Sequence, residues 1–113
     1  MKKIEAIIKP FKLSQVKEAL HELGISGMTL VDVKGFGRQR GSTGGIDPND
    51  AYDDEFLAKM KLEVIVEDNQ VDEVIGSIKS SAYSGKIGDG KIFVSNIEQV
   101  IRIRTGEKDS DAV

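Results

Sequence analysis

Two glycine-rich stretches carry basic side chains at a spacing that suits anion binding: Gly35–Gly41 and Gly85–Lys91. Glycine allows close backbone approach, and successive N–H groups in such turns bind phosphates. The first stretch is not the dinucleotide-binding motif, because Arg40 stands where the third glycine would be. A flexible loop exit explains the first stretch roughly twice as well as a binding role. For the second, an ordinary Asp-Gly turn and a phosphate cradle are equally good explanations.

A pair of arginines near the end of the chain could also meet an anion. In an extended segment residues two apart point the same way, so Arg102 and Arg104 would project two guanidinium groups that suit a polyphosphate. A solvated edge strand explains the pair somewhat better. The sequence offers no evident nucleophile with a base, no His/Cys cluster and no paired catalytic carboxylates, and His21 is interpreted as a surface residue. We therefore expect a binding protein and not an enzyme.

Composition restricts the class of protein. The 113 residues suit one domain, and a net charge of -3 argues against a general nucleic-acid binder. The absence of cysteine excludes disulfides and thiolate metal sites. No apolar run is long enough to span a membrane and no signal-peptide core follows Met1, so we expect a cytoplasmic protein without direct membrane insertion.

The elements that must position these motifs form a repeat. At an offset of 58, Lys3–Ile8 lies over Lys61–Val66, and each copy reads as a strand followed by a helix. Gly24 is expected to cap the first helix, and Asn69 with Asp72 the second. The strands are predicted at Ile4–Ile8, Met28–Val33, Leu62–Val66 and Ile92–Val94, and the helix faces at Leu13, Val16, Leu20 and Leu23 and at Val71, Val74, Ile75 and Ile78.

This order predicts an α+β fold of the ferredoxin-like type. Two βαβ units form a four-stranded antiparallel sheet, with two helices on one face and a long loop between the halves. The other face, with Ile7 and Ile65, would be a bare apolar surface, which predicts self-association. We expect residues 1–113 to form a single domain, residues 37–55 a mobile loop and residues 107–113 a flexible tail.

Four segments taken together resemble the PII nitrogen-regulatory signal-transduction family. They are Met1–Leu13, Gly27–Arg40, Gly85–Val94 and Arg102–Glu107, in the family's order and over nearly the whole chain. The resemblance implies a homotrimer that binds ATP or ADP in its intersubunit clefts, and 2-oxoglutarate together with Mg-ATP. It also implies a nitrogen-linked target, such as an ammonium transporter or an assimilation enzyme, that docks on the long T-loop.

The resemblance also assigns roles to residues. Gln39 would complete the Mg²⁺ coordination, and Lys59 would hold a carboxylate of 2-oxoglutarate. Arg102 and Arg104 of a neighbouring subunit would reach the phosphates. The remaining cleft residues would be Ile7, Met28, Thr29 and Val64 around the base and ribose, with Gly35, Phe36, Gly37, Arg38, Gly88, Asp89, Gly90 and Lys91.

The long loop departs from the family pattern. Ser42–Glu55 is one residue longer than usual and far more acidic, and Ala58 replaces a proline. Tyr52 keeps the spacing to Phe56 of the family's uridylylated tyrosine, but Asp53–Glu55 replaces its apolar neighbours. The partner, the modification and the response to 2-oxoglutarate therefore stay open, and so does the preference between ATP and ADP. A PII-like nucleotide sensor for another target, without a 2-oxoglutarate response, is the alternative.

Two other classes of function are open on the residues alone. Ferredoxin-like folds host many activities, so an enzyme acting on nucleotides is one. An RNA-binding sheet is the other, but it would need aromatic side chains on the strands, where Phe93 is nearly alone.

Overall fold

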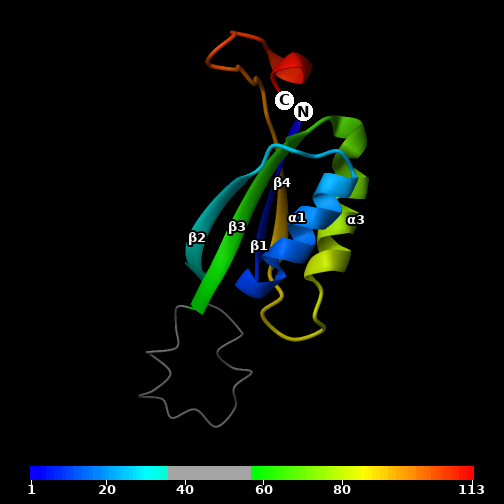
Figure 1. Cartoon of the computed structure of the whole chain (residues 1–113), viewed down its shortest axis with the longest axis vertical. Helices are drawn as coiled ribbons and strands as arrows, with labels where there is room; N and C mark the ends of the chain where they lie inside the picture. Colours follow the sequence, from blue (N-terminus) through cyan, green and yellow to red (C-terminus); the bar gives the residue numbers. More distant parts are fainter. Residues whose placement is uncertain (36–56) are drawn as a thin grey trace.

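The computed structural model describes residues 1–35 and 57–113 (Figure 1). Its four strands form one antiparallel sheet in the order β2-β3-β1-β4. Both α-helices cover the same face of this sheet. The predicted double βαβ architecture is confirmed. The elements are β1 Lys2–Ile8, η1 Pro10–Lys12, α1 Leu13–Glu22, β2 Thr29–Gly35, β3 Leu57–Val66, η3 Asp68–Gln70, α3 Val71–Ala82, β4 Lys91–Asn96 and η4 Asp109–Ala112.

The core lies between the sheet and the two helices. From Ile4 in β1 and from Leu62 in β3, every second residue is buried against the helices, as a strand with one covered face requires. The helices contribute residues at a spacing of about one turn. The two sequence repeats supply equivalent buried positions, which confirms the internal repeat: Ile4 and Leu62, Ala6 and Val64, Ile8 and Val66, Val16 and Val74, Leu20 and Ile78.

Some element boundaries differ from the prediction. Strand β3 begins at Leu57, five residues before the predicted start at Leu62. Lys59 and Lys61 interrupt the apolar pattern there, but Leu57–Lys61 pairs in register with Val31–Gly35 of β2. The ladder of backbone hydrogen bonds, which the side-chain pattern does not record, extends the strand.

One of the two predicted helix caps is confirmed. Gly24 follows α1 with φ 84° and donates its N–H to the His21 carbonyl, while the Ile25 N–H reaches Leu20. This is the Schellman arrangement expected of a glycine after a helix. The cap at Asn69 is wrong. The capping box is formed two residues earlier by Glu67 and Gln70, around the 3-10 turn that leads into α3.

The uncovered face of the sheet is less apolar than expected. Ile7 and Ile65 lie on it, together with the half-exposed Phe93. Its centre is charged, however, because Glu5 pairs directly opposite Glu63. Lys3 Nζ lies 2.7 Å from Glu5 and 3.8 Å from Glu63, and Lys61 lies 3.8 Å from Glu63. The face is therefore apolar at its margins, with a neutral group of two lysines and two glutamates in the middle.

The chain after β4 turns back on itself. The Arg102 N–H donates to the Glu107 carbonyl at 2.9 Å, and the Asp109 N–H donates to Val100 at 2.8 Å. Residues 107–112 thus have local structure, and the fraying of this tail stays a prediction. In the part of the chain that the structure describes, no helix is long and apolar enough to cross a membrane.

Candidate functional site

One end of the sheet gathers several of the predicted binding residues. Gly35, the last residue of β2, pairs with Leu57, and Lys59 follows two residues along β3. On the other side of β3, Ile7 of β1 pairs with Lys61 and also with Lys91, the first residue of β4. The register therefore brings the end of β2, the start of β3 and the turn before β4 to the same end of the sheet.

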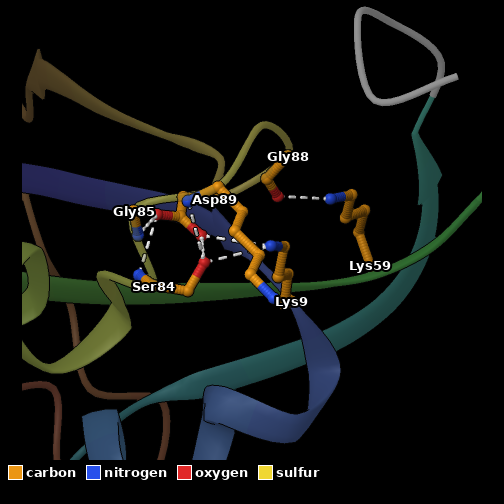
Figure 2. A network of polar contacts seen from close by, with 7 residues as sticks. Lys9, Lys59, Ser84, Gly85, Gly88 and Asp89 are labelled. Carbon is orange, nitrogen blue, oxygen red and sulfur yellow. Dashed lines mark hydrogen bonds and ion pairs between the residues drawn. The ribbon is translucent and has the colours of Figure 1, made fainter. Parts of the chain in front are cut away.

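The turn before β4 is organised around the carboxylate of Asp89 (Figure 2). The carboxylate accepts the N–H of Ser84 at 2.8 Å and that of Gly85 at 3.0 Å, as well as the Ser84 hydroxyl. Lys9 Nζ lies 3.2 Å from it and 3.1 Å from the Ser84 hydroxyl oxygen. Burial works toward a higher pKa of Asp89, but these hydrogen bonds outweigh it and hold the pKa well below its usual range. Asp89 is therefore an ionised structural residue of the turn.

Lys59 reaches the same turn from β3. It is only 8% exposed, and its Nζ donates to the Gly88 carbonyl at 2.6 Å. Burial and the neighbouring Lys9 cation lower the pKa of Lys59, while Asp89 works in the opposite direction. Figure 2 shows Lys9, just after the end of β1, and Lys59 of β3 approaching the turn from different segments. Among residues 1–35 and 57–113, the hydrogen-bond partner of Lys59 is a neutral carbonyl, which leaves its ammonium charge to be met by an anion.

Gly90 is required by a close backbone contact. Its φ is 101°, and a Cβ placed there would lie 1.6 Å from the Ile7 carbonyl oxygen. Any side chain would push the turn away from β1. The glycine therefore sets the distance between the Gly88–Lys91 turn and the end of β1.

The remaining predicted residues lie elsewhere. Thr29 pairs with Glu63 toward the opposite end of the sheet. The side chain of Val64 is in the core, so Val64 could meet a ligand only through its backbone. Arg102 and Arg104 belong to the C-terminal hairpin at that opposite end (Figure 1), where Arg102 pairs with Glu107 at 2.8 Å. Met28 packs half-buried against the core next to Thr29.

Four of the predicted site residues and the candidate modification site lie outside the described residues. These are Phe36, Gly37, Arg38, Gln39 and Tyr52. Among residues 1–35 and 57–113, no group of three His, Asp or Glu side chains could hold a metal ion.

Sequence reasoning missed two residues of this end of the sheet, Lys9 and Ser84. Lys9 belongs to the short segment Lys9–Lys12, whose sequence is typical of an exposed basic segment, so it was not singled out. Its position directly after an apolar strand was the available signal, because the side chain then points toward the end of the sheet. Ser84 sits beside the glycine-rich turn and gives no signal of its own.

The site places lysine side chains at a glycine-rich turn, a combination that can bind an anion. Comparisons with known proteins show which family the chain belongs to. The model of the family described as nitrogen regulatory protein P-II matches residues 1–107. The chain belongs to the P-II family.

Similar relatives cover the full length of the chain. Nitrogen regulatory protein P-II of Azospirillum brasilense is 58% identical over 113 residues, which is all of both chains. The protein of the same description from Pasteurella multocida is 57% identical over the same span. Among solved structures, Arabidopsis thaliana PII bound to citrate superimposes with a TM-score of 0.82 at 43% identity, covering 99% of this chain and 91% of that one. The relatives from Azospirillum brasilense and Pasteurella multocida are named as regulatory proteins.

Proposed function

We propose that this P-II family member is a signalling protein that binds ATP or ADP between the subunits of a homotrimer, and is not an enzyme. The observation that carries the proposal is the division of the predicted site. Gly35, Lys59 and Gly88–Lys91 lie at one end of the sheet, whereas Thr29 and Arg102 lie toward the other. One subunit cannot bring both groups to a single ligand. Two subunits packed side by side can complete the site.

The residues present fit the phosphates of a nucleotide. Lys91 and the backbone of the Gly88–Gly90 turn would hold them on one subunit, and Arg102 and Arg104 would approach from the next. Arginine presents a planar fork that matches phosphate oxygens. Ile7 supplies an apolar surface beside Lys91 for the base or ribose. The negative charge of a bound nucleotide would be met by these basic side chains. Binding of this kind needs no reactive group from the protein.

We extend the proposal to 2-oxoglutarate with Mg-ATP. Lys59 is a buried cation that donates to a neutral carbonyl within the described part of the chain, and a carboxylate would be a stronger partner. The citrate in the plant relative is likewise a small polycarboxylate. Mg²⁺ would be held by the phosphates, by the 2-oxoglutarate and by Gln39, which lies outside the described residues.

The output of the signal would be a protein contact. The segment that joins β2 to β3, residues 36–56, begins directly after Gly35 and ends three positions before Lys59 in the sequence. A ligand that binds the two ends of this segment can favour one loop conformation through its differential affinity. A nitrogen-linked target, such as an ammonium transporter, would bind the loop in one ligand state and leave it in another.

Calorimetry tests the nucleotide site. ATP and ADP are titrated into the wild type and into Lys91→Ala and Arg102→Ala, with Lys79→Ala on the exposed side of α3 as the control. Loss of one charge-assisted phosphate contact should weaken ATP binding by about 1.5–3 kcal/mol in the two site variants only. Unchanged affinity in both would refute the site. A titration of 2-oxoglutarate with Mg-ATP then separates this function from that of a sensor that responds to nucleotide alone.

A further inference from the structure

Lys9 is an unusual lysine because it is almost fully buried. It is 8% exposed, and lysines are rarely buried unless they are paired. It follows β1 directly, and Pro10 restricts its backbone to the extended form that it adopts, with φ -66° and ψ 134°. Its carbonyl accepts the Lys12 N–H at 3.0 Å, which fixes the start of the next turn. The Lys9 backbone is therefore constrained at the point where the side chain leaves the sheet, and the side chain runs in the direction of its polar partners.

That direction leads into the turn before β4. Lys9 Nζ lies 3.1 Å from the Ser84 hydroxyl oxygen and 3.2 Å from the Asp89 carboxylate. Asp89 in turn accepts two backbone N–H groups of the same turn. The carboxylate is three-quarters buried, so it needs a cation to offset its lost hydration. Lys9 supplies that cation from the segment that follows β1.

The residue next to Asp89 is Gly88, whose carbonyl accepts the ammonium group of Lys59 at 2.6 Å. The orientation of this carbonyl depends on the conformation that Asp89 gives to the turn. We infer that Lys9 is a positioning residue of the anion site: by neutralising Asp89 it holds the turn in the form that keeps Lys59 on the Gly88 carbonyl and available to a ligand carboxylate. The inference rests on the proposed role of Lys59.

The ion pair between Lys9 and Asp89 also affects the charge environment of Lys59. Burial lowers the pKa of Lys59, and among the described residues the charged groups that act on it are Lys9, which lowers its pKa further, and Asp89, which raises it. While Lys9 occupies Asp89, the attraction of the carboxylate for Lys59 is largely offset. Without the Lys9 charge, Asp89 becomes a competitor for Lys59, and a ligand carboxylate must displace it.

The test measures Lys59 directly, without a ligand. The pKa of the Lys59 amine is followed by NMR of lysine labelled at Cε, and the turn by the Gly88 amide shift. Lys9→Gln should raise the pKa of Lys59, and Asp89→Asn should lower it. Lys9→Arg should stay close to the wild type, and Lys79→Gln is the control for loss of a surface charge. Changes of opposite sign are not expected from general loosening of the fold.

Binding is measured in parallel by titrating 2-oxoglutarate in the presence of Mg-ATP. Lys9→Gln should weaken 2-oxoglutarate binding about tenfold, and Lys9→Arg should restore most of it. An unchanged Lys59 pKa in both Lys9→Gln and Asp89→Asn would overturn the inference, as would shifts of the same sign. Absence of 2-oxoglutarate binding to the wild type would instead refute the proposed ligand, and the NMR result would still decide the role of Lys9.

Discussion

Replacing Asp89 by asparagine should destabilise the protein at neutral pH. The change keeps the shape of the side chain but removes the negative charge. The carboxylate oxygens of Asp89 lie 2.8–3.2 Å from Lys9 Nζ and from the backbone nitrogens of Ser84 and Gly85. Breaking a fully buried ion pair costs roughly 3–5 kcal/mol. The Asp89 side chain is 24% exposed, and an amide oxygen can still accept one N–H, so we expect about 2 kcal/mol.

A loss of this size should lower the melting temperature by about 8 °C, because each kcal/mol corresponds to about 4 °C in a domain of this size. The assay is thermal unfolding followed by circular dichroism at pH 7 and at pH 3. Asp32→Asn on the exposed edge of β2 is the matched control and should melt like the wild type.

The pH dependence has a definite sign. The pKa of Asp89 is lowered in the folded protein, so its contribution to stability is fully present above the unfolded value of about 4. It is lost progressively as the pH falls below that value toward the lower folded pKa. The difference between the wild type and Asp89→Asn should therefore be smaller at pH 3 than at pH 7. Equal melting temperatures at pH 7, or a difference that grows in acid, would refute this account of the turn.

Three further outcomes are expected. Gly90→Ala should lower the melting temperature by at least as much as Asp89→Asn, because its Cβ would overlap the Ile7 carbonyl. Gly76→Ala within α3 is the control, since its Cβ meets open space and the change should stabilise the protein by about 0.5–1 kcal/mol. Equal effects of the two substitutions in thermal melts would contradict the close contact at Gly90. Glu67→Ala should cost about 1 kcal/mol in chemical denaturation, since it removes half of the capping box, and a cost near zero would argue against that box. Light scattering should give three times the monomer mass at micromolar concentration, and a stable monomer would exclude the composite nucleotide site.

The fold could be predicted from the sequence because the buried positions recur with the spacing of strands and helices. Ile4 with Leu62 and Val16 with Val74 mark the two repeats, and the structure buries all four. The early part of β3 could not be predicted this way. Lys59 and Lys61 look like loop residues until β2 is placed beside them, and backbone pairing leaves no trace in side-chain type.

The candidate site was predicted where glycine and charge coincide, as in Gly88–Lys91. It was missed where a residue acts through a neighbour. Nothing in the identity of Lys9 distinguishes it from Lys12, because burial by a distant turn decides its role. The charged centre of the open sheet face was missed for a similar reason. Glu5 and Glu63 are 58 positions apart, and only the strand register places them opposite each other.

The strand order has a consequence for synthesis of the chain. Strand β1 pairs only with β3 and β4 among the described strands, and β2 pairs only with β3. The first βαβ half thus contains two strands that do not touch each other. When only this half has been synthesised, neither strand has a hydrogen-bonding neighbour. Ile4, Ala6 and Ile8 then lack the core residues that the second half supplies. Pairing such as Lys2 with Val66 and with Asn96 spans most of the chain, which slows folding. The nascent chain should therefore stay susceptible to protease until β3 has emerged, and fold as one unit once β4 is available.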